Sequence, residues 1–315
     1  MKIESRDTGS VAALDRSRRW AGAGAGAGAG LAGARPTAGR LLRDRSLTFL
    51  IVTSVVLTLI PVVWILVQIV MKGSSAMSWT FLTRSLPFSM MKQGGGFLNG
   101  LIGTGIMVGL ASLVSIPLGI LAGVYLVEYG KKNWLAKLIR FFSDVMTGVP
   151  SIFVGVFVYT ALVVKFKYGA IMGAVSLALI MMPIIVRSSE EMLKLVPNEL
   201  KDASYALGAA KWQTVTRVVL PSAAPGLTTG VMLAVARAAG ETAPLIMTAL
   251  GSLQLVTKLA GSPISSLTLL IYSGAGQPFE AAQARAWAGA LELLAIVLIF
   301  TIVARIMSSR SRVSA

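Results

Sequence analysis

Long apolar stretches separated by short polar segments dominate the chain. The first contains IVTSVVLTLIPVVWILVQIV. It supplies the roughly 20 helical residues that a hydrocarbon core of about 30 Å requires. Five further stretches follow, so the pattern predicts six membrane-spanning helices and an all-α polytopic membrane protein. The expected spans are about Leu47–Met71, Leu98–Val127, Phe141–Val164, Gly169–Val186, Gly226–Leu250 and Ala286–Met307.

The polar segments at the two ends define the domain organisation. Residues 1–46 are basic and contain an alternating Ala/Gly tract from Ala21 to Gly30. Alternating glycine cannot pack a core and leaves the backbone entropy cost uncompensated. We therefore expect a disordered tail at 1–46, a transmembrane domain at 47–308 and a short tail at 309–315.

Composition agrees with the membrane class and excludes several kinds of chemistry. Hydrophobic residues make up 55% of the chain and charged residues 13%, against about 25% charged in a soluble domain. Cysteine and histidine are absent, which excludes disulfides, Cys/His metal sites and His-based acid–base catalysis. The Gly-x4-Gly-Lys-Ser/Thr pattern of a P-loop is also missing. We expect no cofactor, no ATP site and no enzymatic activity in this chain.

The formal net charge of +16 indicates an orientation in the membrane rather than nucleic-acid binding. Nine Lys and Arg residues lie in the N-terminal tail, and others cluster in the second and fourth loops and at the C-terminus. Cytoplasmic segments carry such an excess and attract anionic lipid headgroups. Both termini and the segment from Arg187 to Pro221 are therefore expected to face the cytoplasm.

That last segment contains a motif with a defined spacing. It reads Asp-Ala-Ser-Tyr-Ala-Leu-Gly from Asp202 to Gly208, then nine residues, then Val-Val-Leu-Pro ending at Pro221. The pattern predicts a helix capped by Asn198, a tight turn at Gly208, which accepts positive φ, and a second helix from Lys211 to Val219 that stops at Pro221.

This spacing resembles the EAA loop of ABC importer permeases, with Asp in place of Glu and Ser in place of the second Ala. The resemblance implies that the loop, about 192–221, docks on a separate ATPase and transmits its movement. The residues implied in this coupling are Asp202, Ala203, Ser204, Gly208, Leu220 and Pro221. An ordinary amphipathic hairpin at the membrane surface is the structural alternative.

A second group of motifs narrows the family. Ala-Arg-Ala-Ala-Gly-Glu-Thr-Ala-Pro at 236–244 is similar to the PstA-type permeases of phosphate importers, as are Gly-Val-Pro-Ser-Ile at 148–152, Met-Pro-Ile-Ile-Val-Arg at 182–187 and Ala-Trp-Ala-Gly-Ala at 286–290. The resemblance covers about 47–308. It implies the type I ABC importer permease fold and import of inorganic phosphate across the bacterial cytoplasmic membrane. The implied partners are a homologous PstC-type permease, two PstB-type ATPases and an extracytoplasmic PstS-type binding protein.

Charged residues within the spans are the candidate translocation path. Arg237 lies 16 residues after Pro221, and a buried Arg at such depth costs about 2.5–3.5 kcal/mol. We expect it to face the bundle interior and to pair with Glu241 one helical turn later. Arg187, at the predicted end of the fourth span, is either an inner gate or a positive-inside anchor. For Arg237 and Glu241, the alternative is an ion pair that only fixes helix packing.

Gly148, Pro150 and Ser151 interrupt the third span. A broken helix at membrane depth is tolerated where it lines a cavity or is packed by neighbours. The freed N–H groups of such a break would face an anion, although a simple packing kink remains the alternative.

Three other functions compete with phosphate import. Importers of sulfate, molybdate or polyamines share the EAA loop, and the buried Arg argues against polyamines. A stand-alone secondary anion carrier would lack the EAA loop and usually shows repeated halves. A membrane-embedded enzyme is disfavoured by the absence of Cys and His and by the few acids within the spans.

Overall fold

The computed structural model describes residues 38–130 and 133–310, which divide into two units at Ile65 and Leu66. The Ala/Gly tract and the last five residues lie outside the described residues. Helix α2 (Ala38–Ala76) begins within the predicted tail, so residues 38–46 are helical rather than irregular. Its large apolar side chains, such as Phe49, Ile60 and Trp64, are exposed, as expected for a helix that faces lipid.

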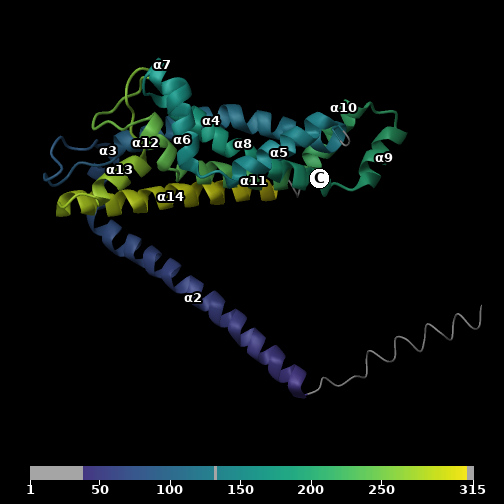
Figure 1. Cartoon of the computed structure of the whole chain (residues 1–315), viewed down its shortest axis with the longest axis horizontal. Coiled ribbons are helices and arrows are strands. Elements are labelled where there is room, and N and C mark those ends of the chain that lie inside the picture. The colour runs from purple at the N-terminus through teal and green to yellow at the C-terminus, as the bar shows by residue number, and fades with distance from the viewer. Residues whose placement is uncertain (1–37, 131–132, 311–315) are drawn as a thin grey trace, which may run out of the picture. The chain divides into compact units, whose positions relative to one another are not determined.

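The regular secondary structure in the described part of the second unit is helical, apart from one isolated β-bridge between Leu250 and Ile264. Long helices run side by side, with α9 and α10 at one end and α3, α12 and α13 toward the other (Figure 1). The elements are α3 (Trp79–Thr83), α4 (Leu98–Val124), η1 (Tyr125–Tyr129), α5 (Trp134–Gly148), α6 (Ser151–Val158), η2 (Tyr159–Val163), α7 (Val164–Phe166), α8 (Ala170–Lys194), α9 (Asn198–Ala206), α10 (Lys211–Thr214), η3 (Val215–Val219), α11 (Leu220–Ala239), α12 (Ala243–Thr248), α13 (Leu267–Ala275) and α14 (Glu280–Arg310). The η elements are π-helical.

Five helices in the described part are long and apolar enough to cross a membrane, and a bent pair makes a sixth span if it is counted as one. That pair is Trp134–Gly148 and Ser151–Phe166, which meet at an angle of 107°. Pro150 causes the break because it lacks an N–H group and disfavours helical backbone at Val149, whose ψ is 127°. The interruption predicted at Pro150 is therefore present, but the helix before it starts at Trp134 instead of Phe141.

The fifth span differs more from its prediction. Helical structure runs without a break from Lys211 to Ala239, so the expected stop at Pro221 is wrong. The wider π-helical turns of η3 end at Val219, two residues before this proline, and such local adjustments accommodate proline within membrane helices. The span also ends at Ala239, before the predicted Leu250, because Gly240 and Pro244 interrupt the helix.

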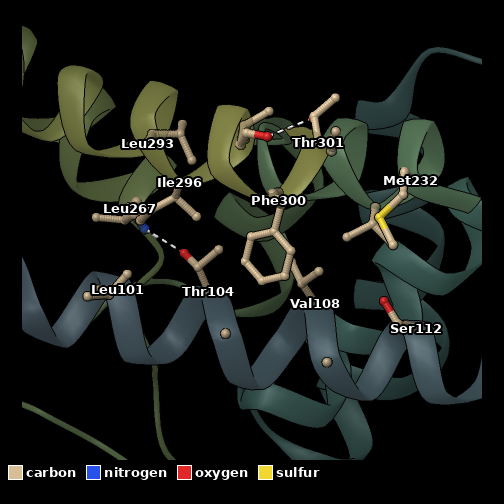
Figure 2. A pocket seen from close by; sticks show the side chains of 16 residues that line it. Leu101, Thr104, Val108, Ser112, Met232, Leu267, Leu293, Ile296, Phe300 and Thr301 are labelled. Carbon is tan, nitrogen blue, oxygen red and sulfur yellow. Dashed lines mark hydrogen bonds between the residues drawn. The ribbon is translucent and has the colours of Figure 1, made fainter. Parts of the chain in front are cut away.

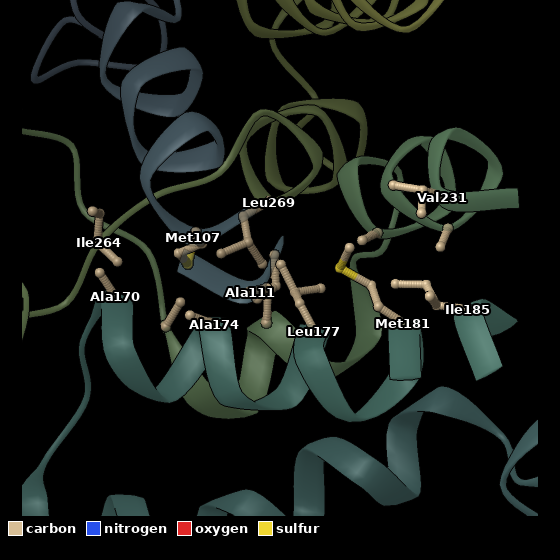
Figure 3. Packing of buried hydrophobic residues seen from close by; sticks show 14 residues of the cluster. Met107, Ala111, Ala170, Ala174, Leu177, Met181, Ile185, Val231, Ile264 and Leu269 are labelled. Carbon is tan, nitrogen blue, oxygen red and sulfur yellow. The ribbon is translucent and has the colours of Figure 1, made fainter. Parts of the chain in front are cut away.

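A buried apolar cluster joins α4, α8, α11, α12 and α13 (Figure 3). Leu177 of α8 lies beside Ala111 of α4, and Met107 of α4 lies over the turn of α8 that carries Ala170 and Ala174. Two glycines of α4 bring these helices together. A Cβ at Gly119 would lie 2.6 Å from Ile185 Cγ2, and one at Gly123 would lie 2.5 Å from Ser189 Cβ. Small residues at such crossings are the usual means of close helix packing in membranes.

We predict that Gly119→Ala destabilises the protein, because the new methyl group overpacks the contact with α8. The expected loss is about 1–3 kcal/mol in the free energy of unfolding. Gly109→Ala in the same helix is the matched control, since no atom lies within 4 Å of its added Cβ. Thermal or denaturant unfolding in detergent micelles measures both. Equal stability of the two variants would contradict the close α4–α8 contact.

Candidate functional site

A small pocket lies at the break between α5 and α6. Thr147, Val149 and Ser151 line it from the break, and Ile180, Pro183 and Ile184 line it from α8. Arg237 of α11 completes the lining with Met146 and Val154. The pocket volume is about 40 Å³, enough for a few water molecules. Two groups predicted separately from the sequence, the interrupted helix and the span arginine, therefore meet at one place.

Arg237 pairs with Glu241, although not in the expected setting. Its Nε lies 3.5 Å from Glu241 Oε1. Glu241 does not belong to the same helix, because α11 ends at Ala239 and Glu241 follows the turn at Gly240. The Arg237 side chain is 58% exposed and that of Glu241 is 15% exposed. The expectation that Arg237 faces the interior of this chain's bundle is therefore wrong.

The break after Ala239 is held in place by hydrogen bonds. The Glu241 N–H donates to the carbonyl of Ala238, and Thr268 Oγ1 of α13 donates to the carbonyl of Glu241 over 2.9 Å. These bonds satisfy backbone groups that the end of α11 would leave unpaired. These hydrogen bonds thus fix the turn that holds Glu241 near Arg237.

Arg187 belongs to a network of ion pairs between α5 and α8. Its Nη1 lies 2.5 Å from Asp144 Oδ1 and its Nε 3.1 Å from Glu191 Oε1. One turn away, Arg140 Nε lies 2.8 Å from Glu190 Oε1. Since α8 continues to Lys194, Arg187 does not end the span as expected from the sequence. Its charge is balanced by two carboxylates and links two helices.

The loop before α11 has the helix–turn–helix form predicted for it. Gly208 adopts a φ of +81°, and its N–H donates to the carbonyl of Tyr205 over 2.9 Å. Ser204 Oγ and Thr214 Oγ1 lie 2.9 Å apart and join the two arms. The expected cap at Asn198 is wrong, because Asn198 is the first helical residue and Pro197 precedes it without a side-chain cap.

The two helical arms of this loop present different surfaces. No residue of α9 is buried, and Asp202 and Ala203 are both exposed. Large apolar side chains are also exposed here: Leu207 is 89% exposed, and Tyr205 of α9 and Trp212 of α10 are exposed as well. Leu220, by contrast, packs against a buried apolar cluster, and Pro221 is exposed at the start of α11. Exposed large apolar side chains outside the membrane spans are typical of a protein interface when they lie together.

Comparison with known proteins identifies the family. Residues 115–313 match the family model described as binding-protein-dependent transport system inner membrane component. The phosphate transport system permease protein PstA of Yersinia pestis is 40% identical over 276 residues, covering 87% of this chain and 93% of that protein. The PstA of Haemophilus influenzae is 42% identical over 254 residues, covering 80% and 89%. The chain belongs to the PstA family of these transport permeases.

Solved structures confirm the fold. A bacterial alginate ABC transporter, solved in complex with its alginate-bound periplasmic protein, aligns with a TM-score of 0.64 at 17% identity, covering 86% of this chain and 96% of that one. The MetNI methionine ABC transporter aligns with a TM-score of 0.52 at 20% identity, covering 68% and 93%. The all-α type I importer permease fold expected from the sequence is thus correct. This PstA-family chain is a multi-pass membrane transport subunit, not an enzyme, and its family implies an ATPase and a substrate-binding protein as partners.

Sequence reasoning about this PstA-family chain missed three buried charged residues. Glu128 pairs with Lys201 of α9. Arg285 donates to the carbonyls of Met90, Lys92 and Gly94, so it holds the loop before α4. Glu292 is buried and neither carboxylate oxygen has a hydrogen-bond partner within the described residues. The signal for Glu292 was a single charge inside an apolar run, whereas Glu128 directly follows the predicted second span and gave no such signal.

A larger apolar pocket lies between α4, α11 and α14 of this PstA-family bundle, with Phe300 and Val108 among its walls (Figure 2). Its volume is about 260 Å³. Thr104 Oγ1 accepts a hydrogen bond from the Leu267 N–H, so this polar group of the wall is already engaged. An apolar cavity does not suit a small, strongly hydrated anion. Ala236 and Ala239 of α11 line this cavity, whereas Arg237 lines the pocket at the helix break. Neighbouring residues of α11 therefore face two different pockets.

Proposed function

We propose that this chain is the membrane permease subunit of an ATP-driven importer that brings inorganic phosphate into the bacterial cytoplasm. The observation that carries the proposal is its similarity, near 40% identity over most of both chains, to proteins named as phosphate transport permeases. The pocket that joins Arg237 to the helix break supports the same chemistry. Phosphate is anionic at neutral pH, and guanidinium offers it planar, paired donors.

The pocket combines two sources of positive potential. Arg237 supplies a full charge, and Ser151 opens α6, whose first N–H groups have no partner within the helix. A helix N-terminus carries a partial positive charge that favours anions. Glu241 would hold Arg237 when phosphate is absent and would limit the affinity, so that the ion leaves again. Gly148 and Pro150 serve by keeping the helix open at this point.

More than half of the Arg237 side chain is exposed on this chain alone. A charge in that position would be too costly to leave facing lipid. A homologous PstC-type permease packed beside this chain would cover it and close a path between the two subunits. We therefore place the translocation path at the interface of a heterodimer, with Arg237 on its wall.

The ion-pair network between α5 and α8 is suited to a gate on the cytoplasmic side. Arg187 and Asp144 connect the two helices, and both side chains are more than half exposed. Exposed ion pairs contribute little to stability, so they break and re-form at low cost. Movement of α5 relative to α8 would open this connection and widen the small pocket at the helix break.

The loop of 192–221 would couple this path to ATP hydrolysis. Its exposed arm carries Asp202, Ala203 and Leu207, and this surface would dock on one of two PstB-type ATPase subunits. A PstS-type binding protein would deliver phosphate from the opposite side. The excess of Lys and Arg in the tails and in this loop supports cytoplasmic termini.

We predict that Arg237→Gln leaves assembly intact and lowers phosphate uptake by about tenfold or more, which corresponds to about 1.4 kcal/mol or more in the transport barrier. The substitution removes the positive charge and leaves Glu241 to repel the anion. The double variant Arg237→Gln/Glu241→Gln should transport better than the single one. Uptake of labelled phosphate at matched protein levels measures the effect.

Arg305→Gln is the matched control for this experiment, because it removes another exposed arginine from a membrane helix. It should transport phosphate as the unaltered protein does. Full uptake by Arg237→Gln would remove Arg237 from the path. Uptake of sulfate in place of phosphate by the unaltered complex would change the assigned cargo.

We predict that Gly208→Pro uncouples ATP hydrolysis from transport. Proline cannot adopt the φ of +81° found at this turn, whereas asparagine tolerates left-handed backbone. Gly208→Asn is therefore the matched control and should retain coupling. ATP hydrolysis stimulated by the loaded binding protein measures the difference. Equal stimulation in both variants would mean that the turn has no part in coupling.

We also predict that the purified chain alone moves no phosphate across liposomes, because its sequence contains no P-loop. Addition of the second permease, the ATPase, the binding protein and ATP should restore uptake. Phosphate-dependent transport by the isolated chain would favour a secondary carrier instead.

A further inference from the structure

Both arms of the loop before α11 make polar contacts with Glu128, in the turn at the end of α4. Glu128 lies in the π-helical segment η1, and its side chain is only 6% exposed. Lys201 of α9 places Nζ 2.5 Å from Glu128 Oε1. Lys211 of α10 donates to the backbone carbonyl of Glu128, and its Nζ lies 4.5 Å from the centre of the Tyr129 ring. The two lysines thus reach the same turn from opposite sides of Gly208.

Apolar packing in the same region does not define this position by itself. Val124 of α4 and Val127 of η1 belong to a buried cluster with Val215 and Val219 of η3. Such packing is non-directional and tolerates sliding between surfaces. A charge-assisted hydrogen bond is directional. The bond between the buried Glu128 and the partly buried Lys201 therefore favours one register of the loop against α4.

Both charges of the pair are largely covered, although they line a surface pocket of about 410 Å³ between η1 and the loop. The Lys201 side chain is 12% exposed and that of Glu128 is 6% exposed. The apolar side chains that would meet the ATPase, above all Leu207, lie on the exposed part of the loop. The pair therefore connects the loop to the membrane bundle, and the most exposed apolar side chain of the loop lies apart from it.

Helices α4 and α8 connect Glu128 to the pocket at the helix break. Gly123 and Gly119 of α4 lie so close to α8 that an added Cβ would overlap Ser189 or Ile185. Helix α8 in turn lines the Arg237 pocket with Pro183 and its neighbours. Closely packed helices move as rigid elements. Displacement of the loop would therefore reach the pocket through α4 and α8.

We infer that Glu128, Lys201 and Lys211 form a coupling latch, which transmits movement of the ATPase-docking loop to α4 and α8. The inference rests on the proposed function, since it assigns positioning residues to that machine. Glu128 and Lys201 are 73 residues apart in the chain, so the latch joins segments that the sequence separates. Breaking it should leave the docking surface of the loop in place but loosen its connection to the path.

The test uses the complete importer, with both permeases, the ATPase and the binding protein, in proteoliposomes. Inorganic phosphate imported per ATP hydrolysed is measured for Glu128→Gln, Lys201→Met and the double variant. Each single variant should lower this ratio by roughly threefold to thirtyfold, the range over which single residues change coupling in packed networks. The double variant should be no worse than the more severe single one, because both remove the same interaction.

Lys137→Gln is the matched control, since it removes an exposed lysine from the neighbouring helix α5. It should keep the ratio of the unaltered complex. Co-purification of the ATPase with each variant shows that the docking surface is intact.

Three results would overturn the latch: an unchanged ratio in Glu128→Gln, a double variant whose defect multiplies those of the singles, or loss of the ATPase from the variant complexes. The last would mean that the pair serves assembly. Absence of phosphate import by the unaltered complex is a separate outcome, which contradicts the proposed function itself. The two failures are therefore distinguishable.

Discussion

Inside a bilayer every backbone N–H and C=O group must find its partner within the protein, because hydrocarbon offers none. This constraint explains why the described part of the chain is built from long helices and why its interruptions are few and supported. At Pro150 the break lines a pocket, and at Gly240 the following turn is held by Thr268. Arg237 stands next to both interruptions. Irregular backbone and fixed charge thus occur together, where an anion would need them.

Several charged side chains within the bundle are likewise paired with partners inside the protein. Pairs that join helices occur where α5 meets α8 and where η1, at the end of α4, meets the loop. The exposed Arg187 pairs are weak links that separate readily, whereas the largely covered Glu128–Lys201 pair is more costly to break, because removing one partner leaves the other charge poorly solvated. The first kind suits a gate and the second a rigid connection. Arg285 plays a comparable structural role elsewhere, where it holds the loop before α4 through three carbonyls.

Helix α11 connects these features. Its start is continuous with the loop through η3, and its end carries Arg237. The chain accommodates Pro221 and Pro225 without interrupting the helix, so movement of the loop acts on a single element of 29 residues, Lys211–Ala239. One side of that element meets the apolar cavity shared with α14, and Arg237 meets the polar pocket at α5 and α6. The arrangement separates a lipid-like environment from a charged one across a single helix.

Local patterns in the sequence were sufficient for the six apolar stretches, the interruption at Pro150, the turn at Gly208 and the family. Each depends on residues close together in the chain, and on length, proline geometry or positive φ. Helix ends were predicted poorly, because Pro221 is accommodated by π-helical turns and α8 continues past Arg187 to Lys194. Only the tertiary structure decided that Arg237 is exposed beside the α5–α6 break, that Asp144 meets Arg187 and that Glu128 meets Lys201. The last two pairs are separated by 43 and 73 residues in sequence, and helical periodicity carries no information about which distant faces will pack together.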